Sequence, residues 1–149
     1  MEVPSTVVSE VARTLITFSG ATIIPDIPEY YQKYPELLGF LSAQKMPWKE
    51  SKTLTGEIGE YIVTMRQASD GVYLVGAATN EKERLLQIPM SFLPKGTFVA
   101  EVIEDGDTAH YLTSRETYKV MKKNVTRKDT LNVRLAAGGG SCIKLVPNK

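Results

Sequence analysis

The stretch PWKESKTLTGEIGEYIVTMR, residues 47–66, marks the point at which the sequence changes from helical to alternating periodicity. Its last six residues, YIVTMR, alternate in the manner of a half-buried β-strand. The same alternation returns in residues 98–103 and 131–135. We therefore expect the chain beyond residue 46 to be built from strands.

Four more candidate strands are separated by turn signals such as SDG, LPKG and EDGD, and they cover residues 71–79, 84–88, 118–122 and 141–146. About seven or eight short antiparallel strands joined by tight turns predict a β-sandwich. In LAAGGGSCIKL, residues 135–145, the glycines lead into another strand and not into a helix. They therefore predict a glycine turn and not a phosphate-binding loop.

The first 45 residues predict a helix, strand and helix segment. Apolar residues recur at helical spacing between residues 4 and 18, GATIIPD at 20–26 favours a short buried strand, and residues 28–44 favour two short helices that begin at prolines. Such a segment is too small to fold alone. The apolar face of its first helix must be covered by the sandwich, by a second copy or by something absent from the sequence.

That apolar helix face carries a specific expectation. It contains Val8, Val11 and Leu15, which we expect to form an association surface between copies of the chain. The fold class predicted overall is mainly β, an antiparallel sandwich with an N-terminal helical segment.

The composition excludes several function classes. The 149 residues include 42% apolar and 23% charged residues, and the formal net charge is +1, which favours a folded domain over a disordered or strongly electrostatic binder. The basic stretch KVMKKNVTRK, residues 119–128, alternates as an exposed strand would. Cys142 is the single cysteine, so no internal disulfide forms, and its apolar neighbours predict a core residue. No apolar run reaches the length of a membrane span and no export signal is evident, so we expect neither a membrane nor a nucleic acid as partner.

The opening stretch also holds residues that a glycosidase would use. Glu50, Glu57 and Glu60 accompany Trp48, the only tryptophan, and such enzymes combine two carboxyl groups with an aromatic platform. However, Glu57 and Glu60 are three residues apart beside glycines, which favours a turn. The glutamates are therefore interpreted as solvated or ion-paired. Trp48 is interpreted as an anchor of the core or of a domain interface, with stacking on a sugar as the alternative.

Four segments together resemble a known family: GATIIPDIPEYYQKYPELLGFL, PWKESKTLTGEIGEYIVTMRQ, GVYLVGAATNEKERLLQIPMSFLPKGTFVAEVIEDG and LAAGGGSCIKL. Their order and spacing resemble the C-terminal end of the glycoside hydrolase family 97 enzymes. The resemblance implies an N-terminal β-sandwich, a central (β/α)8 barrel with the active site, and a C-terminal β-sandwich. It also implies α-glucosidase or α-galactosidase activity, a calcium ion, and a periplasmic or secreted parent enzyme.

On this resemblance, residues 1–45 are the end of the barrel and residues 46–149 are the C-terminal sandwich. The catalytic carboxylates and calcium ligands of the family would lie upstream, so none is carried over to this chain and no cofactor is expected in it. Asp26 alone follows a barrel strand, where catalytic residues stand, and a helix cap or turn is the other interpretation. Trp48 and Asp26 are therefore candidates for sugar or interdomain contact.

These observations predict a non-catalytic accessory domain that supports the barrel of its parent enzyme and contributes to oligomerisation. The alternative is a carbohydrate-binding module, for which Trp48, Tyr73 and Tyr111 are the candidate stacking residues. A third hypothesis is an independent hydrolase that uses the glutamates.

Overall fold

The computed structural model describes residues 5–21 and 28–148. The helices are α1 (Val7–Ile16), α2 (Pro28–Tyr31) and α3 (Pro35–Ser42). The strands are β1 (Glu50–Glu57), β2 (Tyr61–Gln67), β3 (Tyr73–Thr79), β4 (Arg84–Pro89), β5 (Thr97–Asp105), β6 (Tyr118–Thr126), β7 (Thr130–Leu135) and β8 (Gly140–Pro147). The predicted mainly β fold with an N-terminal helical segment is confirmed. None of the helices in the described ranges is long and apolar enough to cross a membrane.

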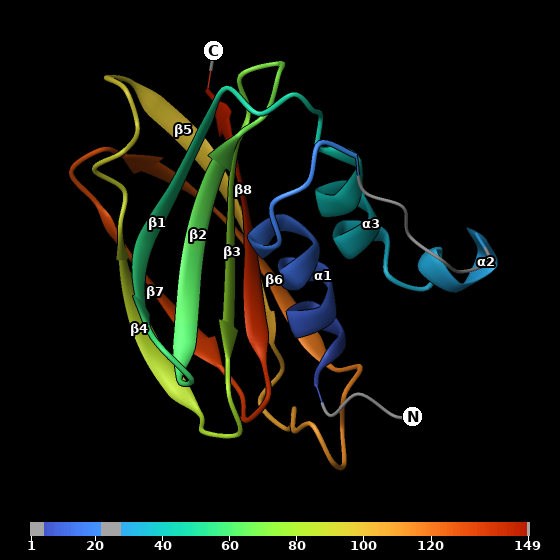
Figure 1. The fold of residues 1–149 in the computed structure, drawn as a ribbon. Helices are drawn as coiled ribbons and strands as arrows, with labels where there is room; N and C mark the ends of the chain where they lie inside the picture. The colour runs from blue at the N-terminus through green and yellow to red at the C-terminus, as the bar shows by residue number, and fades with distance from the viewer. Residues whose placement is uncertain (1–4, 22–27, 149) are drawn as a thin grey trace.

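The strands form two antiparallel sheets of unequal size. The larger sheet has the order β1-β2-β3-β8-β5-β6, and the smaller one pairs β4 with β7. In Figure 1 the β4–β7 sheet lies on one side of the larger sheet, and α1 and α3 lie on the other. The molecule thus has three layers, with the larger sheet in the middle.

Both faces of the middle strands of the larger sheet, β2, β3, β8 and β5, are largely buried, and each face belongs to a different hydrophobic core, whereas the edge strands β1 and β6 are mostly exposed. All seven residues of β3 are buried, because its alternate side chains point into the two cores. The core between the sheets includes Val63, Met65, Val75, Val102, Leu131 and Ile143. The core between the larger sheet and the helices includes Val8, Ala12, Leu15, Leu37, Phe40, Leu74 and Cys142. The prediction that Cys142 is a core residue is therefore confirmed.

Helix α1 lies directly on the backbone of β3 and β8. A Cβ atom on Gly76 would stand 2.9 Å from the carbonyl oxygen of Ala12, and one on Gly140 would stand 2.7 Å from the Cα atom of Ser9. Real Cβ atoms do not approach other atoms so closely, so only glycine permits this packing. The start of the helix is fixed by Thr6, whose hydroxyl accepts a hydrogen bond from the Ser9 amide at 3.2 Å.

The turn between β7 and β8 is built around a buried carboxylate. Oδ2 of Asp105 accepts hydrogen bonds from the backbone amides of Ala136, at 2.9 Å, and Gly140, at 2.8 Å. Gly138 has a φ of 64°, in the left-handed region that favours glycine. The glycine turn predicted from LAAGGG is confirmed, and Asp105 is the residue that holds it.

Several boundaries differ from the sequence-based expectation. The first helix is shorter than the expected 4–18, because Thr6 caps its start and the backbone becomes extended at Thr17, and the basic strand continues to Thr126. Most of the strand expected at 20–26 lies outside the described residues. The two short helices expected in residues 28–44 are confirmed as α2 and α3.

Replacement of Asp105 should change how stability depends on pH. Burial raises the pKa of Asp105 above its ordinary value, so the folded state binds this proton more tightly than the unfolded state. The free energy of unfolding therefore falls as pH rises from the ordinary value of about 4 through the raised pKa. Asp105→Asn keeps an acceptor oxygen and does not titrate, so the variant should gain stability relative to the wild type over this window.

Urea unfolding at a series of pH values measures this effect. Asp105→Ala is the matched variant, because it leaves two buried amides without an acceptor. It should lose roughly 2–4 kcal/mol relative to the wild type at low pH, and this loss should shrink as pH rises and the wild type itself is destabilised. A stability difference between Asp105→Asn and the wild type that stays constant with pH would contradict the assignment.

Candidate functional site

The glutamates of the opening stretch lie on a sheet edge and its hairpin. Glu50 and Glu57 stand at the two ends of the edge strand β1 and are exposed. Glu60 follows in the β1–β2 turn, where it pairs with Arg84 and lies 3.9 Å from Nζ of Lys82. These positions fit solvated and ion-paired groups and do not form a pair of carboxyl groups in a cleft.

A glycosidase also needs a carboxyl group that keeps its proton at neutral pH. A hydrogen bond from Lys45 lowers the pKa of Asp70, and one from Arg134 lowers the pKa of Glu83. Burial raises the pKa of Asp105, but this side chain is 1% exposed and is occupied by the glycine turn. Asp105 is therefore a structural group that a sugar cannot reach.

The calcium ion implied by the family resemblance finds no ligand set in this part of the chain. Across the described ranges, no three His, Cys, Asp or Glu side chains lie close enough together to hold a metal ion. The side chains in these ranges therefore do not fit the ion.

The most unusual polar group is Arg66, which is only 5% exposed. It lies on the helix side of β2, where its Nε donates to the carbonyl oxygen of Leu15 at 2.7 Å and its Nη2 to that of Ile16 at 3.0 Å. Carbonyl groups at the end of a helix lack partners within the helix, and a cation there is favourable. Arg66 therefore fastens the end of α1 to the sheet.

Trp48 belongs to the same junction. Its Nε1 donates to the carbonyl oxygen of Ser19 at 3.2 Å, and the guanidinium carbon of Arg66 lies 5.9 Å from its ring centre and 5.1 Å from that of Phe18. We call Phe18, Trp48 and Arg66 the junction cluster. Trp48 is half-buried against the helix-side core, so it joins the sandwich to the segment after α1.

The two other aromatic candidates for sugar stacking differ in accessibility. Tyr73 is 8% exposed and packs edge-on against Phe98 in the core between the sheets, so its ring faces are not available to a ligand. Tyr111 is half-buried and stacks on His110, with ring centres 4.7 Å apart. Asp26, the remaining candidate for sugar or interdomain contact, lies outside the described residues.

The predicted association surface on α1 is not where a second copy could reach it. Val8 and Leu15 are fully buried and Val11 is nearly so, all against the chain's own sheet and α3. The structure thus corresponds to the first alternative left open by the sequence, in which the sandwich covers the helix. The apolar stripe specified that the helix is buried but not what buries it.

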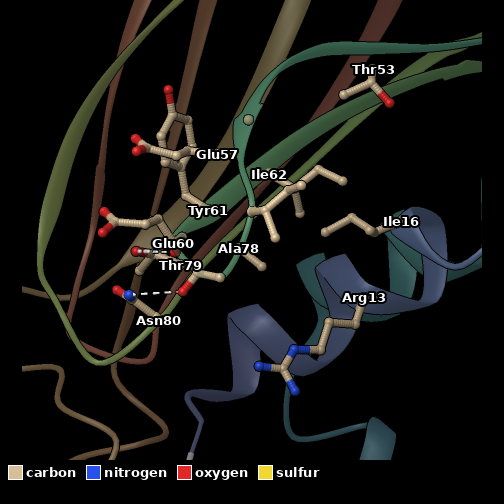
Figure 2. A pocket seen from close by; sticks show the side chains of 13 residues that line it. Arg13, Ile16, Thr53, Glu57, Glu60, Tyr61, Ile62, Ala78, Thr79 and Asn80 are labelled. Atoms are coloured by element: carbon tan, nitrogen blue, oxygen red, sulfur yellow. Dashed lines mark hydrogen bonds between the residues drawn. The ribbon is translucent and has the colours of Figure 1, made fainter.

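Two surface grooves flank α1. The first, which we call the hairpin groove, has a volume of about 610 Å³ and lies between α1 and the β1–β2 hairpin (Figure 2). Its lining includes Arg13, Ile16, Thr53, Glu57, Ile58, Glu60, Ile62, Ala78 and Asn80. The second, the helix groove, has a volume of about 410 Å³ and lies between α1 and α3. Its lining includes Val7, Glu10, Val11, Tyr34, Leu37, Leu38 and Leu41.

Sequence reasoning missed Arg66 and Ile58. Arg66 is the polar member of an alternating strand, and alternation alone does not reveal that the helical segment covers this face of β2. Ile58 stands in the hairpin turn and is completely exposed, and an apolar residue between Glu57 and Gly59 is unusual for a turn.

The geometry defines a β-sandwich with a helical layer on its larger sheet. Residues 47–146 match the family model described as "Glycosyl-hydrolase 97 C-terminal, oligomerisation". The chain therefore belongs to this family, and the resemblance seen in the sequence is confirmed.

Individual relatives agree with this assignment. The chain is 32% identical over 136 residues to a retaining alpha-galactosidase from Bacteroides thetaiotaomicron, which is 91% of this chain and 20% of the relative. It matches the structure of a glycoside hydrolase family 97 enzyme from Pseudoalteromonas sp. strain K8, in complex with acarbose, with a TM-score of 0.92 and 26% identity over 98% of this chain and 23% of that one. The chain thus spans about a fifth of the length of such relatives.

A beta-arabinopyranosidase is similar in fold alone, with a TM-score of 0.74 and 15% identity over 94% of this chain and 21% of that one. The sandwich with its helical layer therefore recurs in a second kind of glycosidase at low sequence identity.

Arg66→Met should destabilise the fold, because the side chain keeps its apolar stem and the carbonyl groups of Leu15 and Ile16 lose their donor. The expected loss is about 1–3 kcal/mol in urea unfolding, together with a red shift of the Trp48 fluorescence. Arg84→Met is the matched control, since Arg84 also lies over a ring, that of Tyr61, but pairs with Glu60 near the surface. An equal loss in both variants would refute a special role for Arg66.

Proposed function

We propose that this chain is a non-catalytic accessory and assembly domain of a family 97 glycoside hydrolase. In this function it supports the catalytic barrel of its parent through the helical layer and brings two copies together through the sandwich. The retaining activity of the curated relative belongs, in this view, to the part of the enzyme that this chain does not span.

The observation that carries the proposal is the second hydrophobic core. Residues 5–45 precede the matched region at 47–146, yet α1 and α3 bury their apolar faces on the larger sheet together with Leu74 and Cys142. The sandwich is therefore rigidly connected, through α1, to the part of the parent enzyme that would precede this helix. A connection of this kind suits a domain that fixes the position of its neighbour.

The outer side of the helical layer supports contact with the barrel. The helix groove is lined mainly by apolar side chains, and Leu38 at its edge is 37% exposed. Phe18, in the junction cluster, is 71% exposed just beyond the end of α1. Large apolar side chains gathered on one side of a domain mark a surface that a neighbouring domain covers.

The catalytic part of the proposal predicts that the isolated chain does not hydrolyse aryl α-glucosides or aryl α-galactosides. Its exposed and ion-paired glutamates do not face one another across a cleft as the two carboxyl groups of a glycosidase do. Release of the aryl group, measured by absorbance, should equal that of buffer. Turnover that disappears in Glu50→Gln or Glu60→Gln would overturn this part.

The assembly part predicts that the isolated chain associates in solution. Sedimentation equilibrium over a concentration series should show a mass above that of the 16.5 kDa monomer. A chain that remains monomeric up to roughly millimolar concentration, where an association would be very weak, would count against self-association.

A further inference from the structure

The β1–β2 hairpin combines a protruding apolar side chain with an apolar recess. Ile58 stands completely exposed at the turn, and Gly59 beside it has a φ of 76°. The hairpin groove lies next to this turn, with Ile16, Ile62 and Ala78 among its lining residues. A lone exposed isoleucine is ordinary, but one placed at the rim of an apolar groove forms a knob and a hole on the same surface.

The charges around the groove are also of opposite sign on its two sides. In Figure 2, Arg13 extends from α1 on one side, while Glu57 and Glu60 lie on the other, with Ile62 and Ala78 between them. Among the described residues, Arg13 and Glu57 have no salt-bridge partner, whereas Glu60 pairs with Arg84. An unpaired cation and an unpaired carboxylate therefore flank one apolar floor.

A surface with these properties is complementary to itself. In a two-fold interface, each contact between residue i and residue j occurs twice, so one patch must carry both members of every pair. The hairpin groove carries both an apolar knob and an apolar recess, and both an unpaired positive and an unpaired negative charge. A two-fold rotation would match each with its complement.

We propose that the hairpin groove is the surface on which a second copy of this chain binds. Ile58 of each copy enters the groove of the other, and Arg13 faces the partner's Glu57. This inference rests on the proposed assembly function and names the surface that performs it.

The position of the hairpin favours a second copy over the catalytic part of the parent. β1, β2 and their turn lie within residues 47–146, the region whose family description includes oligomerisation. The catalytic part joins the chain ahead of α1 in the proposed arrangement and has the apolar helix groove near its point of entry. The hairpin groove, whose apolar floor is flanked by opposite charges, is therefore available to another partner.

A single exposed substitution tests the knob. Ile58→Asp should weaken association of the 149-residue chain at least about 30-fold in sedimentation equilibrium, the effect of losing one strong interface contact. Leu85→Asp is the matched control, because Leu85 is also an exposed apolar residue, 74% accessible, but lies on β4 in the smaller sheet. The control should associate like the wild type, and both variants should keep the wild-type circular dichroism and unfolding midpoint.

Charge reversal tests the pairing. Arg13→Glu and Glu57→Arg should each weaken association by about 10-fold, and the double variant should recover most of the wild-type affinity. Recovery identifies direct pairing, since two unrelated surface changes would add their losses.

The outcomes separate this inference from the proposed function. The wild-type chain could associate while the variants Ile58→Asp and Arg13→Glu have the same dissociation constant. This result would overturn the assignment of the hairpin groove as the interface and leave the proposed assembly function in place. Equal loss in Ile58→Asp and Leu85→Asp would likewise overturn the surface. A wild-type chain that is monomeric throughout would overturn both.

Discussion

The close contact between α1 and the larger sheet is the constraint on which the other features depend. Gly76 and Gly140 let the helix backbone touch the strands, and Arg66 then binds the end of the helix through two carbonyl groups. Without this contact the helix-side core would be open to water. Both grooves would also lose a wall, because each is lined by residues of α1.

This arrangement explains why the domain offers surfaces for binding other protein parts but no cluster of side chains suited to catalysis. The middle strands of the larger sheet are covered on both faces, so their side chains serve packing, and the buried Asp105 holds a turn. What remains for function lies on the outer side of the helices and at the hairpin. Surfaces of this kind bind other parts of a protein assembly, and such binding is the function proposed for the chain.

The sequence predicted the elements well because local periodicity determines them. Alternation and turn signals located β2 to β8 but not the edge strand β1, and proline and glycine located the starts of α2 and α3 and the turn at Gly138. It could not predict the partner of α1, since an apolar stripe specifies burial but not the surface that provides it. The role of Gly76 and Gly140 could not be predicted either, because a glycine inside a strand more often indicates a weakened strand or a bulge than close packing of a helix.

The candidate site was predicted less well, for a related reason. Alternation alone suggested that β2 has one face toward solvent, whereas α1 covers that face as well and turns Arg66 into a buried cap. Trp48 packs against the helix-side core and donates to the carbonyl oxygen of Ser19, while its contact with a sugar or a neighbouring domain stays a prediction. Ile58 and Arg13 are distant in sequence, so only the fold brings them to one groove.

Native-state hydrogen exchange would test most directly whether α1 and the sandwich form one cooperative unit. We predict that amides in the middle of α1, such as that of Ala12, are protected to nearly the same free energy as amides of β3 and β8, because the helix cannot open without exposing the helix-side core. Exchange of the α1 amides through a local opening several kcal/mol below that of the strands would contradict it.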